Sequence, residues 1–414
     1  MNHLAFKALP FLFYAFISLS INSHYLYSQY VGAAVPFLNI PPSGASQAIG
    51  NCGVAFAPTD VFSTLGNPAH LGILSSEYNL IISSYPSLMK LFQTSDDNTG
   101  FMNHGFALGY NFGRDSSSIP ISIGAAYIYQ DVDLGEYAIT LEDGSKLGTY
   151  HSNESANNFS IGAYIDLGIK LGIGITYKNI ESNISPVIIP DSGITAFEGT
   201  AGAFDIGIFA SFPIVESMII CEGLSLDIDA ALGMSLTNIG SELDYRDESE
   251  PLPRKSNIGY SVSAGLNYKL NNSIYELFKV DWTCEAEDLL VKRDTLGFDY
   301  EPAFSDVNFV QNFLLLSSPN KESVRFGVSV SVLEMLRFAF GSFSHWDDWI
   351  STYGFGIRLK GILKLYSGFF NDSFVKYLAE HIDLGFYFAN TNYPPIGSNR
   401  HESFSLVLSM RNIF

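Results

Sequence analysis

The chain has 414 residues, enough for one large β-barrel or for two to three soluble domains. Charged residues make up only 15% of it and aromatic residues 14%, so it carries less charge than a soluble surface usually needs. The net charge of −20 and the lack of a basic cluster exclude nucleic acid as a partner.

The amino-terminal residues have the pattern of an export signal. Lys7 supplies a positive charge, and Leu9 to Ile21 form an apolar run that is short for a membrane-spanning helix. We therefore predict a signal peptide over residues 1–29, and the alternative is a retained amino-terminal anchor. No later segment is long and apolar enough to be a spanning helix.

The next segment, residues 30–76, has no long strand pattern. It holds Gly44, Gly50, Gly53 and Asn67-Pro68, with short apolar pieces between them. Such a segment would either wrap around the outside of a barrel or fold into its lumen as a hatch. Because a barrel of about fourteen strands has room inside, we predict a hatch over residues 30–76 and a barrel over residues 77–414.

Apolar and polar residues alternate from Tyr78 onward, which is the period of a β-strand. In residues 159–177 nearly every odd position is apolar, and the even positions are mostly Gly, Ser, Asp, Lys or Thr. A polar face this rich in Gly and Ser is typical of a crowded lumen wall, with the apolar face toward lipid. The predicted strands are 77–86, 103–113, 118–130, 157–166, 169–179, 203–213, 225–238, 256–270, 273–284, 322–332, 335–344, 350–360, 380–390 and 402–414.

These strands predict an all-β protein, an antiparallel transmembrane barrel of about fourteen strands with mostly alternating short turns and long loops. Two connections, 214–224 and 361–379, are longer than short turns usually are, and the second contains a stretch, Asp372 to Glu380, that could form a small helix. The charged wall residues are expected in the lumen or at its rims, because Arg or Lys facing mid-bilayer lipid costs about 2–4 kcal/mol. They are Asp166, Lys170, Arg325, Arg337, Arg358, Lys360, Asp383 and Arg411.

The last strand ends the chain on an aromatic residue. Phe404, Leu406, Leu408, Met410 and Phe414 share one face, and Ser405, Ser409 and Arg411 share the other. This pattern resembles the closing strand of a bacterial outer-membrane barrel. We therefore predict that Leu408, Met410 and Phe414 form the signal that the barrel-insertion machinery reads.

Residues for catalysis or metal binding do not form a pattern. Cys52, Cys221 and Cys284 include no Cys-x-x-Cys pair, so we interpret them as packing residues, with one disulfide possible but unassigned. Gly-x-Ser-x-Gly and the phosphate-binding Gly-rich loop are absent. The stretch Asp131 to Glu136 is too short for a calcium loop. We predict no enzyme, no catalytic residue, no metal and no cofactor.

Three short motifs resemble the PorV/PorQ family in their order and spacing. The first is Gly44 to Ala57 followed by Asp60 to Gly72, which contains Asn67-Pro-Ala-His-Leu71 with His70 where the family usually has Gly. The second is Leu236 to Tyr245 followed by Leu252-Pro, and a weaker third is Asp288 to Val291. The family is similar to FadL-type barrels of fourteen strands with an amino-terminal hatch. By this resemblance Asn67, Pro68, Ala69 and Leu71 form the hatch motif.

The resemblance implies a place in the outer membrane of a Gram-negative-type bacterium, in contact with its lipid. It also implies a non-enzymatic role in export or surface attachment of secreted proteins, with such clients or type IX secretion subunits as partners. The alternative is a FadL-like channel for hydrophobic small molecules, which predicts an apolar pocket above the hatch and a kinked strand. A general porin is third, since a hatch argues against an open pore. Phe298-Asp-Tyr300 and Trp346 to Trp349 would suit partner binding or an aromatic girdle.

Overall fold

The computed structural model describes residues 32–412, except 57–59, 90–98, 115–119, 141–143, 190–192, 246–247, 271–272, 295–296, 319–321, 346–347, 371 and 393–399. The predicted signal peptide and Phe414 therefore lie outside the described residues.

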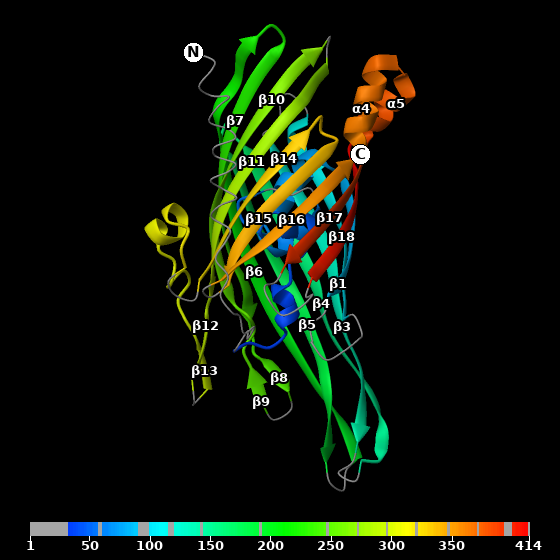
Figure 1. Ribbon diagram of the computed structural model, residues 1–414, viewed down its shortest axis with the longest axis vertical. Coiled ribbons are helices and arrows are strands. Elements are labelled where there is room, and N and C mark those ends of the chain that lie inside the picture. The colour runs from blue at the N-terminus through cyan, green and yellow to red at the C-terminus, as the bar shows by residue number, and fades with distance from the viewer. Residues whose placement is uncertain are drawn as a thin grey trace.

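Fourteen antiparallel strands form a closed barrel (Figure 1). The ring runs from β5 through β1 to β18 and on to β6, which pairs again with β5. The wall strands are β1 (Leu80–Met89), β2 (Thr99–Asn111), β3 (Ile121–Thr140), β4 (Lys146–Asp166), β5 (Lys170–Ile189), β6 (Gly193–Cys221), β7 (Leu224–Gly240), β10 (Lys255–Leu270), β11 (Ser273–Leu289), β14 (Ser323–Val332), β15 (Leu336–His345), β16 (Asp348–Arg358), β17 (Ile382–Asn392) and β18 (Arg400–Met410).

Each predicted strand corresponds to one wall strand, so the predicted fourteen-stranded barrel is confirmed. Four strands are much longer than predicted: β3 to β6 have 20, 21, 20 and 29 residues. About ten residues are enough to cross a bilayer at a tilt. The hairpins β3–β4 and β5–β6 therefore extend well beyond the rest of the wall, at the lower end of Figure 1.

Several predicted loops contain regular structure. Residues 214–221 continue strand β6, where register shifts against β7 interrupt the alternation, so the prediction of a connection over 214–224 is wrong for all but its end. The other connections contain β8 (Leu243–Tyr245), β9 (Glu248–Glu250), β12 (Val291–Asp294), β13 (Gly297–Tyr300), the 3₁₀ helix η3 (Phe112–Arg114), the π-helix η4 (Val310–Leu314), α4 (Leu359–Phe370) and α5 (Ser373–His381).

The two ends of the barrel differ. We call the end with the turns at 167–169, 222–223 and 333–335 and the end of β18 the short-turn end, and the other the hairpin end. The expected small helix after residue 372 is α5, and Asp372 caps it by accepting hydrogen bonds from the amides of Phe374 and Val375 at 2.9 and 3.1 Å.

The wall turns its apolar face outward. On β5, Leu171, Ile173 and Ile175 are 43, 59 and 45% exposed, whereas Thr176 and Lys178 are buried. The same alternation holds on β18, where Phe404 and Leu406 are exposed and Ser403 and Ser405 are buried. This arrangement confirms the predicted faces: the Gly- and Ser-rich parity points into the barrel.

The amino-terminal residues lie inside the barrel. We call described residues 32–77 the inner segment; it contains the 3₁₀ helix η1 (Pro36–Asn39), α2 (Gly44–Ala48), the 3₁₀ helix η2 (Val61–Leu65) and α3 (His70–Glu77). Its helices, blue in Figure 1, are seen between the strands. Because α3 continues to Glu77 and β1 starts at Leu80, the wall begins slightly later than the predicted boundary at residue 77. In the part of the chain that the structure describes, no helix is long and apolar enough to cross a membrane.

Candidate functional site

The inner segment lies directly against a row of wall glycines. Gly109, Gly124, Gly162, Gly174 and Gly207 come from β2 to β6 and are paired in register, each with the next. A side chain at any of them would collide with the inner segment, whose backbone or side chains fill the space where a Cβ would stand. The Gly-rich parity of the sequence is therefore a contact surface for the inner segment.

The opposite wall makes the same kind of contact. Gly233, Gly259, Gly327, Gly341 and Gly354 lie against Ala48, Ile49, Gly50 and Val54 of the inner segment. On the four remaining strands, β1, β11, β17 and β18, the inner segment makes hydrogen bonds to the wall. Taken together, the inner segment touches each of the fourteen wall strands.

The motif at residues 67–71 is part of this close contact. The Asn67 amide donates to the carbonyl oxygens of Val54 at 2.8 Å and of Ile208 on β6 at 3.0 Å. Its own oxygen accepts from the amide of Ala69 at 3.1 Å. Asn67 thus holds together two turns of the inner segment and one wall strand.

The other motif residues fill the space beside the glycines. The carbonyl of Pro68 lies over Gly174, the carbonyl of Ala69 lies over Gly172, and Leu71 packs beside Gly124 and Gly162. His70 is buried with its ring edge-on to Phe209 at 5.5 Å between centroids. The structure therefore brings all of the predicted motif residues together at one contact.

Helix α2 is bound to the last two strands and to β16. The amide of Gly44 donates to the Ser405 hydroxyl at 2.8 Å. The side chain of Gln47 donates to the Thr391 hydroxyl at 2.9 Å and to the carbonyl of His401 at 2.8 Å. The Thr352 hydroxyl accepts from the amide of Gly50 at 2.9 Å. All of these groups are buried, so each bond replaces one to water.

A buried charged cluster holds the middle of the inner segment. The Glu285 carboxylate accepts hydrogen bonds from the amides of Gly53 at 2.8 Å and Val54 at 2.9 Å. Arg325 lies 3.6 Å from Glu285, also contacts Glu287, and donates to the Asn51 carbonyl at 3.2 Å. A buried charge needs such partners, because losing its water is expensive.

Two lysines, of which Lys178 is buried and Lys255 is largely buried, balance the acidic groups. Lys255 lies 3.1 Å from Glu287. On the facing wall, Lys178 lies 2.8 Å from Asp205 and donates to Asn238 at 2.7 Å. These pairings depend on which positions of different strands stand opposite one another, so sequence spacing offers no signal for them.

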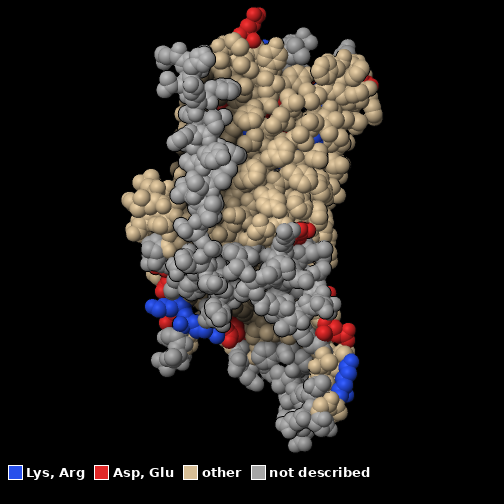
Figure 2. Space-filling model, in the orientation of Figure 1, with Lys and Arg blue, Asp and Glu red and all other residues tan. Residues whose placement is uncertain are grey.

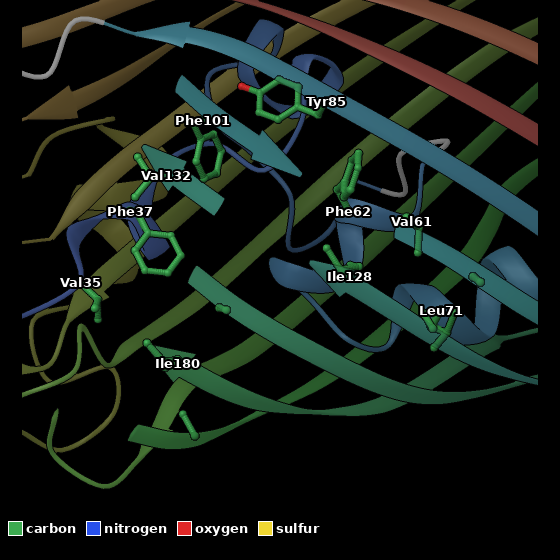
Figure 3. Packing of buried hydrophobic residues seen from close by; sticks show 14 of the residues in the cluster. Val35, Phe37, Val61, Phe62, Leu71, Tyr85, Phe101, Ile128, Val132 and Ile180 are labelled. Carbon is green, nitrogen blue, oxygen red and sulfur yellow. The ribbon is translucent and has the colours of Figure 1, made fainter. Parts of the chain in front are cut away.

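Apolar side chains of the inner segment and of the wall fill part of the lumen. Phe37 and Phe62 of the inner segment share a buried cluster with Phe101, Ile128 and Ile180 of the wall (Figure 3). Further members of this cluster are Val35, Tyr85, Val132, Leu243, Tyr245 and Leu252. We call this cluster the apolar compartment.

The lumen on the short-turn side holds a cavity of about 450 Å³. The inner segment forms its floor with Ala55, Phe56 and Ile73. Its wall carries both signs of charge, from Asp166, Lys170, Asp229, Glu276, Lys279, Asp281, Glu334, Arg337 and Arg358. This charged cavity differs from the apolar pocket that a FadL-like channel led us to expect.

The predicted lumen charges lie on the inner face or at the rims. Arg358 pairs with Asp383, and Arg411 lies 2.8 Å from Glu77 at the short-turn end. Lys360 lies 3.3 Å from Glu334. In the insertion signal, Leu408 and Met410 lie on the outward face of β18, whereas Phe414 is outside the described residues.

The remaining candidates do not assemble into a reactive site. Cys52, Cys221 and Cys284 are free, and Cys52 and Cys284 are buried. Asp131 and Asp133, from the loop-like stretch, lie on strand β3 and pair with β4. Among the described residues, no group of three or more His, Cys, Asp or Glu side chains is placed to hold a metal ion.

No family model matches this chain, and no curated protein matches it. Solved structures of other proteins, among them two toluene transporters, do align with it. The toluene transporter TbuX from Ralstonia pickettii has 12% identity and a TM-score of 0.44, over 89% of this chain and 98% of its own. The Pseudomonas putida toluene transporter TodX has 9% identity and a TM-score of 0.41, over 89% and 96%.

A FadL homologue from Pseudomonas aeruginosa has 9% identity and a TM-score of 0.38, over 89% of this chain and 98% of its own. At this level of similarity these structures assign no substrate to this chain. None of the three is a PorV/PorQ protein, so that resemblance stays a prediction.

Proposed function

We propose that this protein is an outer-membrane channel for hydrophobic small molecules, closed by its own inner segment. The observation that carries the proposal is the division of the lumen. Apolar side chains of the inner segment and of the wall pack together in the apolar compartment, whereas charged side chains line a cavity on the short-turn side of the inner segment.

The proposed direction of passage follows from the chemistry of the compartments. Bacterial outer-membrane barrels place long loops outside and short turns in the periplasm. A hydrophobic molecule would then pass from outside along the apolar compartment, whose packed side chains would have to move aside, and leave through the charged cavity. Because the inner segment touches every wall strand, passage requires the inner segment to move.

The long hairpins favour a second candidate function, the export or surface attachment of secreted proteins. The hairpins β3–β4 and β5–β6 present extended strands well past the membrane-crossing length. Such strands offer backbone and side-chain surface to a protein client. Secretion-system subunits and secreted clients are the partners proposed in this case.

The two candidates are separated by mass spectrometry of what co-purifies with the tagged protein from mildly solubilised outer membranes. The channel predicts bound fatty or aromatic small molecules. The second function predicts exported proteins that share one carboxy-terminal domain, or attachment-machinery subunits. Recovery of those proteins without any bound hydrophobic molecule would contradict the channel.

A shortened variant sharpens this test. Asp133 pairs with Asn153, and Asn183 pairs with Glu198, so the hairpin ends can be cut there and closed with short turns. The channel predicts that hydrophobic molecules still co-purify with the shortened barrel. The second function predicts that the clients are lost.

A further inference from the structure

Helices α4 and α5 form a hairpin at the short-turn end, next to the carboxy-terminal strand in Figure 1. The hairpin joins β16 to β17 and is tied down at both of its ends. The amide of Arg411 donates to the carbonyl of His381 at 2.8 Å. Gly361 lies directly against the backbone of Leu333 and Glu334 in the turn between β14 and β15.

The charged side of α4 faces the barrel. Lys360 lies 3.3 Å from Glu334, and Lys364 also pairs with Glu334. The Lys364 ammonium additionally lies 5.5 Å from the centre of the Tyr275 ring on β11. The cations of this helix are therefore used in attaching it to the wall.

The aromatic side of the hairpin faces away from the barrel. Phe369, Phe370 and Phe374 are 81, 69 and 67% exposed, and Tyr366 packs on Phe370 with ring centres 4.6 Å apart. Tyr377, one helical turn after Phe374, is also exposed. In Figure 2 the protruding surface at the upper right is almost free of charged atoms. Exposed aromatic groups gathered in this way mark an interaction surface.

Lipid is the occupant that the position of this surface favours. The strands that carry the hairpin expose Ile357 on β16 and Leu384 and Phe386 on β17, so the aromatic side continues the outward apolar face of the wall. Aromatic residues are enriched at the boundary between headgroups and acyl chains. An amphipathic helix with such a face lies in that boundary.

We infer that the α4–α5 hairpin inserts its aromatic side into the phospholipid leaflet at the short-turn end. The inference rests on the proposed place of the barrel in the outer membrane. It adds a membrane contact made by helices, lying in the plane of the interface, to the contact made by the strands. Since the cations of α4 are engaged with the wall and Lys376 is the one lysine of α5, binding is expected to depend mainly on apolar insertion and only weakly on salt.

The test uses the full-length protein in vesicles of phosphatidylethanolamine and phosphatidylglycerol that contain a lipid quencher near the headgroups. The exposed Cys221 is first replaced with Ser, and single cysteines are introduced by Phe370→Cys and Phe374→Cys and labelled with a fluorophore. Lys376→Cys is the matched control, because Lys376 is exposed and lies on the other side of α5 from Phe374. Ile173→Cys, on the outward face of β5, reports the barrel itself.

The inference predicts that the labels at 370 and 374 lose most of their fluorescence to the lipid quencher at both low and high salt, whereas the label at 376 is quenched from water. Quenching of the labels at 370 and 374 by a water-soluble quencher would overturn it. So would a blue shift that appears only at high protein density, which would make a second copy the occupant. If the label at 173 is not quenched by the lipid quencher either, the proposed membrane barrel is also wrong. If only the labels at 370 and 374 are not quenched by it, the barrel stands and the helical insertion is wrong.

Discussion

The side chain of Asn67 donates a hydrogen bond to the backbone oxygen of Ile208 over 3.0 Å, joining the inner segment to strand β6. The bond is reachable because the neighbouring wall position is Gly207, where any side chain would collide with Asn67. The Asn67 side chain and the space left beside it by Gly207 therefore form one contact between the inner segment and the wall. Its strength decides how readily the inner segment opens.

Replacing Asn67 tests this contact between the inner segment and β6. Asn67→Ala removes two donated bonds, each worth about 0.5–1.5 kcal/mol. Asn67→Asp keeps an acceptor for the Ala69 amide but turns a carboxylate toward the carbonyls of Val54 and Ile208, so it is expected to loosen the inner segment more than Ala does. Hydrogen exchange of the peptides in residues 32–77 measures the opening. An Asp variant as well protected as the native protein would contradict this account.

Filling the glycine row should displace the inner segment. At Gly174→Val the new side chain meets the carbonyl of Pro68, and overpacking of this kind costs about 1–3 kcal/mol. Gly148→Val is the control, because Gly148 is also on a wall strand and has open space around it. We expect faster hydrogen exchange of the inner segment in the first variant only, with the wall strands still protected. Equal behaviour of the two variants would mean that the close contact does not hold the segment.

Removal of the Glu285 carboxylate should release the middle of the inner segment. Glu285→Ala leaves the Gly53 and Val54 amides without an acceptor and takes one carboxylate from Arg325, a loss of about 3 kcal/mol. Glu285→Gln keeps an acceptor oxygen and is expected to lose less. Glu250→Gln breaks an exposed pair with Arg293 and should change stability by less than about 1 kcal/mol. Thermal unfolding of the purified barrel ranks the three, and any other order would count against the role of Glu285.

The sequence predicted the wall well because each strand there has one apolar and one polar face. A slip of one residue would expose the wrong set of side chains. The alternation therefore determines both where a strand lies in the sequence and which of its side chains point outward. The prediction of strands failed in residues 131–156 and 180–202. There the hairpins extend beyond the barrel, and their outward face no longer needs to be apolar. It also failed after Pro213 on β6, where bulges shift the register.

The candidate site was predictable only in part. Asn67 to Leu71 was singled out by its resemblance to a family motif, and the structure places this stretch against glycines of the wall. Arg325 was predicted as a wall charge, but Glu285 and Glu287 follow the end of the strand predicted over 273–284, and the structure places them on β11. The contact of this charged cluster with Gly53 depends on the register between β11 and β14. It also depends on the path of the inner segment, which lies more than 200 residues earlier in the chain.

The most direct test of the central claim is to lock the inner segment to the wall. Ala48 of α2 and Ala389 of β17 are buried in one small cluster, and both lie within a few ångströms of Gly354. We would introduce Ala48→Cys and Ala389→Cys in a background without the native cysteines, with each single substitution as a control. Uptake of a radiolabelled long-chain fatty acid or aromatic hydrocarbon by cells carrying the variant is then measured with and without reductant. The account predicts that oxidation stops uptake and that reduction restores it. Unchanged uptake by the fully cross-linked protein would contradict a channel gated by the inner segment.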